Sequence, residues 1–403
     1  MSLRARFLCL RRNIHAITNL AENRAVQILF EDGTSGHYPY VWLRDCSLDS
    51  KTYSITDSIK ARQLLIRDFD INVCPERIHH DVPNNSLVIH WPGGATSRYD
   101  KGWLWSRNPT STVVRNLRRK FYLEDTKPWN TEEIIKRLCK FQHGQFLKEE
   151  KVLHDFLTAV SEDGIAILTN GPTHDGVVNN IGERIGFIHR THFGIEFKVA
   201  KKENASNMAY ASGDELPYHT DFPSLSQPPQ LQLLHMMQRA TEGGVNMFVD
   251  GFKVAELMKA ECPDLYKILC EAELEYIEEG YDVHEIEAGK EITFHFDMVA
   301  RHKVFTTNDE GRVVKVQFGN AMRTLKTFTM YCYRPDMQLL FYLENGDTVL
   351  WANTRLLHAR SAYSSAPNQE RSIAGCYFSW DIVKSRIRLA RDRLQLPENQ
   401  LSV

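Results

Sequence analysis

The sequence predicts a mainly β (α+β) protein: a double-stranded β-helix of the jelly-roll, cupin-like type, preceded by a small β-rich N-terminal domain. Three observations lead to this prediction. Short apolar runs such as AVQILF, QLQLLHMM and DTVLWAN recur between Asp-Gly, Asn-Gly and Gly-Gly turns. Helical patterns interrupt the strands at a few places instead of following every strand, as a βαβ fold would require. The 403 residues are also too many for one ordinary core.

Four segments divide the chain. Residues 1–23 are a basic segment, and residues 24–105, with runs such as SLVIHWP, are the small β-rich domain. Residues 106–150 are charged and contain TEEIIKRLCKF, which has apolar residues at helical spacing after a capping Thr131. We therefore expect a linker there with a helix leading into the main domain, residues 151–403.

Within the main domain, KVLHDFLTAVSEDG predicts a helix that ends at Gly164. GFKVAELMKAECPDLYKILCEA predicts a single helical insert among strands. The expected strands are IAILTN, QLQLLHMM, VNMFVDG, RVVKVQF, DTVLWAN and IAGCYFSW.

The first twenty residues, MSLRARFLCLRRNIHAITNL, are basic and contain no acidic residue before Glu22. This composition is typical of a mitochondrial transit peptide, which forms an amphipathic basic helix. The alternative is a short disordered basic tail on a cytoplasmic protein. We expect a mitochondrial location.

The totals exclude several classes of protein. Lys and Arg number 49 against 51 Asp and Glu, a net charge of −2, and no long basic run follows the first dozen residues, which argues against a nucleic-acid partner. No run of 18 apolar residues occurs, so no membrane span is expected. The eight cysteines form no CxxC pair and are interpreted as reduced thiols. The expected partner is a small molecule.

A His-x-Asp pair, His219 and Asp221, is the main candidate for chemistry. It could be a surface hydrogen bond, an acid/base couple or two metal ligands. In a strand, residues i and i+2 project to one face, so both side chains would aim at one point. Non-haem iron oxygenases use two histidines and one carboxylate, and His358 in NTRLLHARSAY offers the second histidine. Arg371, thirteen residues later, can bind a carboxylate through two hydrogen bonds, as the far end of 2-oxoglutarate would require.

Single elements of this pattern are weak evidence. A lone histidine near a strand end is more often structural than a ligand, and His235, which closes an apolar run, is expected to be a core or rim histidine. The combination of the His-x-Asp pair, a distant histidine and a following arginine in a double sheet favours the iron site.

Six stretches between about Arg24 and Leu394 are informative together: YVWLRD, YHTDFPSL, PPQLQLLH, GGVNMFVDGF, NTRLLHARSAY and YFSWDIVKSRIRLARDRL. Through them the chain resembles the γ-butyrobetaine dioxygenase and trimethyllysine dioxygenase family of carnitine biosynthesis. The family implies that Fe(II), 2-oxoglutarate and O2 hydroxylate a C–H bond of a trimethylammonium substrate, giving succinate and CO2. The proline-rich stretch and the last motif are more similar to γ-butyrobetaine dioxygenase. We therefore expect hydroxylation of γ-butyrobetaine to L-carnitine.

The resemblance also assigns residues. It implies iron ligands His219, Asp221 and His358, and it implies Arg371 as the anchor of 2-oxoglutarate. A quaternary ammonium has no N–H to donate and is held by aromatic faces. The matching positions, with the asparagine that would meet the substrate carboxylate, are Phe193, Phe197, Tyr210, Tyr377 and Asn207. Ordinary core packing is the alternative for the aromatic residues.

Three departures from the family matter. Its N-terminal domain usually binds zinc, but here only Cys46 remains of the cysteine cluster and Ala95 stands in place of the histidine, so zinc is not expected. Gly319 occupies a position where relatives carry an asparagine near the substrate, which puts recognition of the anionic end in doubt. Phe193 and Phe197 stand where γ-butyrobetaine dioxygenase usually has Tyr and Trp, which weakens the cation-π cage.

Ascorbate is expected as the reductant, and a homodimer is left open.

Other readings of the same residues stay open. Trimethyllysine dioxygenase shares the chemistry, and the basic N-terminus favours it slightly. A zinc hydrolase built from the same three ligands would activate water but would have no need of Arg371. A non-catalytic module that binds trimethylammonium ligands would have no need of three metal ligands.

Overall fold

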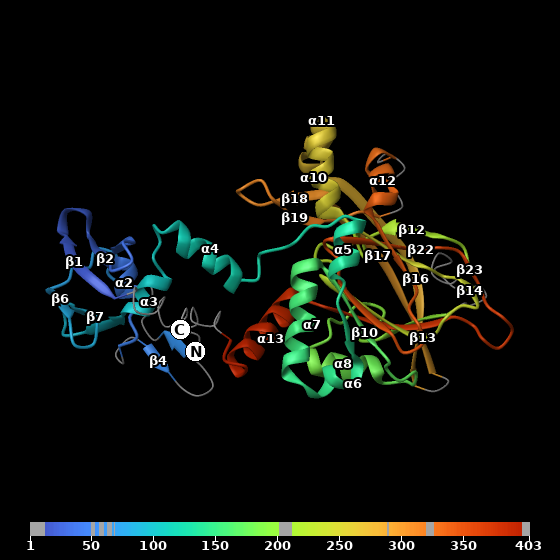
Figure 1. The fold of residues 1–403 in the computed structure, drawn as a ribbon, viewed down its shortest axis with the longest axis horizontal. Helices are drawn as coiled ribbons and strands as arrows, with labels where there is room; N and C mark the ends of the chain where they lie inside the picture. The colour runs from blue at the N-terminus through green and yellow to red at the C-terminus, as the bar shows by residue number, and fades with distance from the viewer. Residues whose placement is uncertain are drawn as a thin grey trace. The chain divides into compact units, whose positions relative to one another are not determined.

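The structure, a computed structural model, describes residues 13–49, 53–55, 60–62, 67, 69–200, 212–287, 290–319 and 326–396. The pattern of contacts between residues divides the chain into two compact units (Figure 1). The N-terminal unit comprises Met1–Glu124 with Gln395–Val403, and the C-terminal unit comprises Asp125–Leu394.

The N-terminal unit is built on two three-stranded antiparallel sheets, with strand orders β1-β2-β3 and β6-β7-β8, and a short hairpin β4-β5. The strands are β1 Ile14–Leu20, β2 Ala25–Phe30, β3 Ser35–Pro39, β4 Tyr53–Ile55, β5 Lys60–Arg62, β6 Arg77–Asp81, β7 Ser86–His90 and β8 Thr96–Asp100. The helices are η1 Ala21–Asn23, α2 Tyr40–Asp45, α3 Lys101–Ser106 and α4 Thr112–Phe121. Inward side chains of both sheets form one core around Trp91 and Tyr38. The Tyr38 hydroxyl donates to the Leu104 carbonyl at 2.8 Å, so this buried phenol has its partner.

The basic segment 1–23 differs from the expected helix where it can be described. Ile14–Leu20 is strand β1, which pairs antiparallel with β2. Ile14 is buried, and the polar residues after it face outward along the edge of the sheet. Sheet pairing therefore overrides the amphipathic helix in this part, and residues 1–12 lie outside the described residues.

The C-terminal unit contains two larger sheets. One has six strands in the order β11-β24-β13-β21-β10-β9, and the other has four in the order β12-β22-β15-β20. Their strands are β9 Lys140–Gln142, β10 Ile165–Thr169, β11 Phe197–Ala200, β12 Leu216–His219, β13 Leu231–Gln238, β15 Asn246–Asp250, β20 Gln338–Phe341, β21 Thr348–Ala352, β22 Leu356–Arg360 and β24 Ser372–Phe378. Two-stranded pairings add β14 Glu242–Gly243, β16 Leu274–Glu287, β17 Lys290–His302, β18 Phe305–Thr307, β19 Val313–Val316 and β23 Tyr363–Ser364.

The two larger sheets pack face to face around a shared core. Trp351 and Ile373 from the six-stranded sheet meet Phe248 and Leu356 from the four-stranded sheet in one buried cluster. The residues next to them in sequence, such as Leu357, point away into a second cluster, as the two-residue period of a strand requires. The predicted double-stranded β-helix is confirmed.

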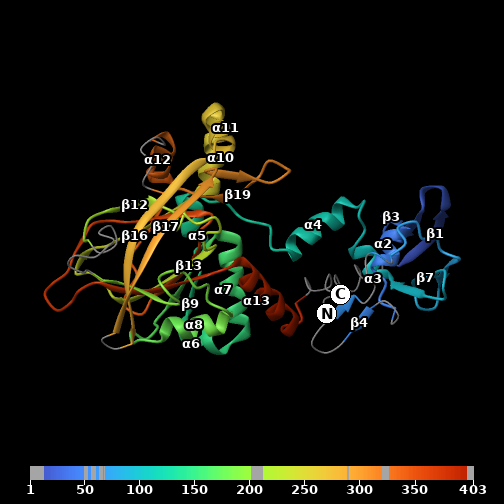
Figure 2. The same ribbon diagram turned by 180° about the vertical axis from the view of Figure 1, so that it is seen from behind.

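Helices cover the outer faces of both sheets (Figures 1 and 2). The helices are α5 Thr131–Arg137, α6 His143–Lys148, α7 Glu150–Asp163, α8 Val177–Ile185, α10 Gly251–Glu261, α11 Pro263–Glu271, α12 Lys326–Cys332, η3 Pro335–Met337 and α13 Trp380–Arg393. α7, α8 and α13 lie along the six-stranded sheet, whereas α10 lies against β15 and β22 of the four-stranded sheet. Within the described ranges, no helix combines the length and the apolar character that crossing a membrane requires.

The helix boundaries confirm one expectation and correct two others. α7 ends at Gly164, whose φ of +83° is a left-handed cap that glycine adopts without strain. The expected single insert is two helices, because Pro263 cannot continue α10 and instead begins α11. α5 is capped by Asn130 rather than Thr131, since Asn130 and Glu133 form a reciprocal capping box.

A long hairpin, β16 and β17, was not expected from the sequence. Its strands contain acidic and aromatic residues and offer no clean alternation, for example LEYIEEGYDVHEIE. The hairpin is held by its ladder of antiparallel pairs and by contacts with the segment after Asp221: Glu278 accepts a hydrogen bond from Ser224 at 2.6 Å.

A buried ion pair joins the two sheets to the helices. Arg355 donates to both carboxylate oxygens of Asp250, at 3.1 Å from Nε and 2.7 Å from Nη2. Asp250 also accepts the backbone N–H groups of Phe252 and Trp129, both at 3.0 Å. Arg355 donates further to the carbonyl of Glu162 at 2.8 Å, where α7 ends. The carboxylate is fully buried, so every lone pair of the ion must be satisfied by these partners.

Removal of Arg355 should strongly destabilise the C-terminal unit. Arg355→Ala leaves the Asp250 carboxylate buried and unpaired, and we expect a loss of about 3–5 kcal/mol in the free energy of unfolding. Urea denaturation followed by circular dichroism would measure it. The matched control is Arg239→Ala, which breaks an exposed pair with Glu344 and should cost about 0–1 kcal/mol. Equal losses for the two variants would contradict the assigned role of the buried pair.

Candidate functional site

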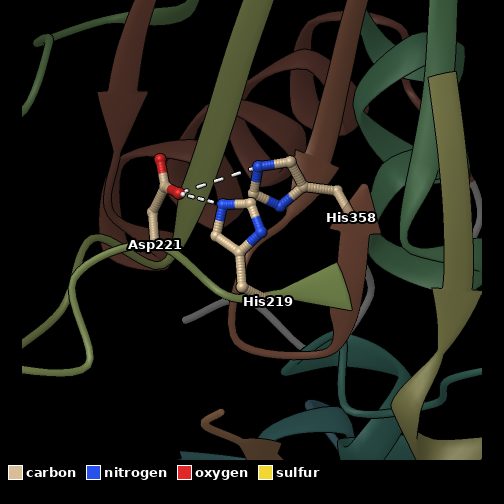
Figure 3. Close-up of side chains that lie close together, drawn as sticks. All are labelled: His219, Asp221 and His358. Atoms are coloured by element: carbon tan, nitrogen blue, oxygen red, sulfur yellow. Dashed lines mark ion pairs between the residues drawn. The ribbon is translucent and has the colours of Figure 1, made fainter. Parts of the chain in front are cut away.

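Three side chains converge between the sheets: His219, Asp221 and His358 (Figure 3). Asp221 Oδ1 lies 3.3 Å from His219 Nε2 and 3.6 Å from His358 Nε2. All three residues are buried, and each offers a ligand atom within 4.8 Å of the others. In the part of the chain that the structure describes, this is the one group of three or more His, Cys, Asp or Glu side chains that converges in this way.

The four-stranded sheet brings the two histidines together. His219 ends β12 and is the direct antiparallel partner of His358 in the middle of β22, so the two rings lie 4.2 Å apart. Asp221 lies beyond the end of β12, and the expectation that the His-x-Asp pair shares one strand is therefore wrong. Thr220 donates its N–H to the Phe318 carbonyl at 2.8 Å, outside the pairing of β12 with β22, and the chain turns at Phe222, whose φ is +58°. Asp221 is therefore held by side-chain contacts and not by strand pairing.

The protonation states suit a divalent metal ion. His219 Nδ1 lies 2.8 Å from the Pro217 carbonyl, which fixes the proton on Nδ1 and leaves the lone pair of Nε2 toward Asp221. Burial and the neighbouring His219 lower the pKa of His358 to about 3. Burial raises the pKa of Asp221, but the imidazoles and Tyr377 outweigh it and lower the pKa to about 2. A neutral His358 imidazole and an ionised Asp221 carboxylate are the forms that bind metal.

Within the described part of the chain, two atoms at the centre of this group have no hydrogen-bond partner. They are His219 Nε2 and Asp221 Oδ1, both buried, and their 3.3 Å approach does not have hydrogen-bond geometry. Buried polar atoms are normally satisfied, so converging acceptors without donors suit the binding of a cation. The residues therefore fit a metal bound by two histidines and one carboxylate.

Two residues from other parts of the C-terminal unit, Asn353 and Tyr377, hold Asp221 in place. Asn353 accepts from the Asp221 backbone N–H at 2.8 Å and donates to its carbonyl at 3.1 Å. The Tyr377 hydroxyl donates to Asp221 Oδ2 at 2.7 Å. Asn353 lies in the turn between β21 and β22, whereas Tyr377 lies on β24 of the opposite sheet.

Aromatic rings form a wall beside the carboxylate. Phe197 is stacked on Tyr377 with ring centroids 5.1 Å apart, and Phe222 meets Tyr377 edge-on at 5.3 Å. Phe193 contacts Phe222 at 5.6 Å and Phe197 at 6.3 Å. Gly375, opposite Phe197 in the sheet, makes this stacking feasible, because a Cβ there would lie 2.5 Å from the Phe197 ring. The structure thus brings together Phe193, Phe197 and Tyr377, three of the predicted aromatic residues.

Two predicted substrate residues, Asn207 and Tyr210, lie outside the described residues. His235 is buried as expected, with Nδ1 2.8 Å from Thr348 Oγ1 and Nε2 2.8 Å from the Pro172 carbonyl. It points away from the three converging residues and belongs to the packing of the six-stranded sheet.

Arg371 is a buried cation that no described carboxylate neutralises. It is 5 % exposed, and among the described residues no Asp or Glu forms an ion pair with it. Its guanidinium lies over the Tyr363 ring at 5.2 Å, and the Arg360 guanidinium lies over the same ring at 4.7 Å. Burial and the neighbouring Arg360 lower the pKa of Arg371 to about 10, so it keeps its charge at neutral pH. Two buried guanidinium groups near one ring form a site for an anion.

The profile of the taurine catabolism dioxygenase TauD, TfdA family matches residues 124–377. The chain belongs to this family. The N-terminal profile of γ-butyrobetaine hydroxylase-like proteins matches residues 17–125. Members of the dioxygenase family use iron and 2-oxoglutarate, and this chain is a 2-oxoglutarate-dependent dioxygenase.

Named relatives match nearly the whole dioxygenase. A γ-butyrobetaine dioxygenase of Pongo abelii is 30 % identical over 388 residues, covering 92 % of this chain and 96 % of that one. The γ-butyrobetaine dioxygenase of Homo sapiens is 30 % identical over 386 residues, covering 92 % and 95 %. A mitochondrial trimethyllysine dioxygenase of Bos taurus is 26 % identical over 364 residues, covering 87 % and 82 %. The resemblance predicted from the motifs is confirmed.

Sequence reasoning missed three residues of the site. Phe222 follows Asp221 directly, but nothing local indicated its left-handed backbone. Arg360 lies two residues after His358 on the same strand, so the two-residue period could have placed it on the same face. Asn353 stands in the motif NTRLLHARSAY, yet its hydrogen bonds to Asp221, which is 132 residues away, have no sequence signal.

Loss of any one of the three converging side chains should abolish the dioxygenase reaction. For His219→Ala, Asp221→Ala and His358→Ala we expect no 2-oxoglutarate decarboxylation in folded protein. The loss should exceed the about 10- to 100-fold effect of removing a residue that only hydrogen-bonds to a ligand. His174→Ala, at an exposed histidine that contacts the Asp175 carbonyl, is the control. Substantial turnover by any of the three would contradict the assignment.

Arg371→Lys should weaken cosubstrate binding. Lysine keeps the charge but loses the planar pair of donors, so the apparent KM for 2-oxoglutarate should rise by about tenfold or more, which is ~1.4 kcal/mol or above. Steady-state kinetics with Arg239→Lys as an exposed control would measure it. An unchanged KM would move the cosubstrate anchor to another residue.

Proposed function

We propose that this dioxygenase hydroxylates γ-butyrobetaine to L-carnitine with Fe(II), 2-oxoglutarate and O2. The observation that carries the proposal is the aromatic wall of Phe193, Phe197, Phe222 and Tyr377, which stands directly beside the buried Asp221. The similarity to γ-butyrobetaine dioxygenases over 92 % of the chain supports it.

The proposal assigns the metal to His219, Asp221 and His358. Bound Fe(II) would supply the activation of O2, coupled to the oxidation of 2-oxoglutarate to succinate and CO2. The chain's own contribution is to present two imidazoles and one carboxylate without reorganisation, because the Pro217 carbonyl and Tyr377 already hold two of the three groups. Burial keeps bulk water from the same atoms.

Arg371 is proposed to bind the far carboxylate of 2-oxoglutarate. Its support is physical: a buried guanidinium without a described carboxylate is costly unless an anion pairs with it. Arg360 adds a second positive charge, because its guanidinium also lies over the Tyr363 ring. This arrangement favours an anionic cosubstrate and counts against a zinc hydrolase, which has no use for it.

The aromatic wall is proposed to hold the trimethylammonium group. A quaternary ammonium gains from contact with aromatic faces and has no hydrogen to donate, so a wall of aromatic rings suits it. Ordinary core packing explains Phe193 and Phe197 less well, because both rings are only partly buried. Tyr210 is proposed to complete this wall.

The anionic end of the substrate must be recognised differently from the relatives' asparagine at position 319. A Cβ on Gly319 would lie 2.9 Å from the Pro223 ring, so an asparagine does not fit there unless Pro223 moves. We propose that Asn207 contacts the substrate carboxylate. This departure is also the reason to keep trimethyllysine, which carries an additional α-amino group, as the alternative substrate.

The proposal also covers the location, zinc, the reductant, the oligomeric state and the partner. We propose a mitochondrial location, which the basic N-terminus and the mitochondrial trimethyllysine dioxygenases support. Zinc is not expected in the N-terminal unit, because Cys46 and Ala95 leave too few ligands. Ascorbate as the reductant and a homodimer are expectations that follow from the family resemblance alone. The partner is a small molecule, as the dioxygenase relatives indicate.

Turnover against a panel of trimethylammonium acids tests the substrate. The purified, iron-loaded protein is incubated with 2-oxoglutarate and either γ-butyrobetaine or trimethyllysine, and hydroxylated product and succinate are measured by mass spectrometry. The proposal requires more product from γ-butyrobetaine at equal concentration. Preference for trimethyllysine would select the alternative, and binding of both without any succinate would favour a non-catalytic module.

A matched pair of ligands tests the aromatic wall. The carbon isostere of γ-butyrobetaine, with a tert-butyl group, has the same shape but no charge, and cation-π contact is worth about 0.5–2 kcal/mol per ring. We expect weaker binding of the isostere by calorimetry, and Phe197→Leu should narrow that difference. Asn207→Ala should weaken the binding of γ-butyrobetaine and of its isostere equally. Equal binding of the two ligands to the wild type would leave the wall as apolar packing, while the dioxygenase assignment would stand.

A further inference from the structure

We infer that Tyr377 is a positioning residue for the metal-binding carboxylate as well as part of the aromatic wall. Its hydroxyl holds one oxygen of Asp221, so that the other oxygen alone faces the two imidazoles. The inference rests on the metal site of the proposed function. The proposed function itself gives Tyr377 only a role in substrate binding.

The two oxygens of Asp221 have separate partners. Oδ2 accepts the Tyr377 hydroxyl at 2.7 Å, whereas Oδ1 lies 3.3 and 3.6 Å from the two histidine Nε2 atoms. Asp221 and Tyr377 are both buried, with 6 % and 3 % of their surface exposed. In such an environment a hydrogen bond to an ionised group is strong and is not exchanged for water.

Asp221 needs this support because its strand has already ended. β12 stops at His219, so no strand pairing holds the carboxylate, and the next residue, Phe222, has a left-handed backbone. Asn353 fixes only the backbone of Asp221. The rotation of the carboxylate about its side chain is fixed by Tyr377, which projects from the opposite sheet.

The position of Tyr377 on β24 is itself well defined. It pairs with Gln232 in the neighbouring strand β13 and accepts the His189 backbone N–H at its carbonyl at 2.7 Å. Its ring is stacked on Phe197 and edge-on to Phe222. The ring is therefore set by the sheet and its aromatic neighbours, and the hydroxyl is directed at Asp221 without further reorganisation.

One side chain thus connects the wall that contacts substrate with the group that binds metal. A change that removes the whole ring disturbs both, so Tyr377→Leu cannot separate the two roles. Tyr377→Phe removes only the hydroxyl and keeps the ring, its stacking and its volume. The two variants together distinguish the hydrogen bond from the packing.

Metal affinity measured without turnover tests the inference. Metal-free full-length protein is titrated with Co2+ by calorimetry, and the visible absorption of bound Co2+ reports the geometry of the site. We expect Tyr377→Phe to raise the Kd for Co2+ by about 10- to 100-fold and to change the absorption bands, because the carboxylate can rotate. Tyr377→Leu should weaken binding to a similar extent.

Two further variants complete the experiment. Tyr276→Phe removes another buried hydroxyl, which donates to the Gln317 carbonyl at 3.2 Å, and should leave the Kd unchanged. His219→Ala should abolish Co2+ binding. If Tyr377→Phe binds Co2+ with the Kd of the wild type, or with a Kd no higher than that of Tyr276→Phe, the inference is overturned and the proposed metal site stands. If His219→Ala binds like the wild type, both are overturned.

Discussion

The buried pair of Asp250 and Arg355 is the interaction on which the arrangement of the C-terminal unit depends. Asp250 ends β15 and begins α10, while Arg355 stands in the turn that leads into β22. The additional bond from Arg355 to the Glu162 carbonyl ties α7, which covers the other sheet, to the same point. A buried ion pair seldom adds net stability, but it specifies one arrangement, because any shift leaves a charge unpaired in the core. Here it fixes where β22 starts, and His358 follows three residues later.

The site is assembled from both sheets, each contributing what the other cannot. The four-stranded sheet supplies the histidines through the direct pairing of β12 with β22. The six-stranded sheet supplies Tyr377, and Arg371 directly precedes its strand β24. A metal and an anion between two sheets would be expensive to bury if the ligands had to reorganise on binding. The sheet ladders and the bonds to Asp221 remove most of that cost in advance.

The sequence predicted the parts of this structure that depend on local pattern. A short apolar run identified the strand that carries Tyr377, and the motif spacing identified the converging groups. The strand that carries His358 was not expected: DTVLWAN predicts one strand that ends near His358, whereas this strand, β21, stops at Ala352 and His358 lies in the next strand, β22. The failures have physical reasons. The two-residue period assumes an extended chain and so predicts that His219 and Asp221 share a strand, whereas β12 ends at His219. The hairpin β16–β17 has no clean alternation, since its stability comes from tertiary contacts. Long-range partners such as Asn353 have no local signature.

The dual contact of Tyr377 bears on how a dioxygenase of this kind could couple substrate to metal. In the proposed mode of binding, a substrate held against the ring would contact a side chain whose hydroxyl bonds to Asp221, the proposed metal ligand. The substrate contact and the carboxylate would then be joined by a single hydrogen bond. Such coupling is reciprocal: a metal that fixes Asp221 also fixes the ring and pre-orders the wall. The wall should accordingly bind a trimethylammonium ligand more tightly when metal is present, even for a ligand too short to reach the metal.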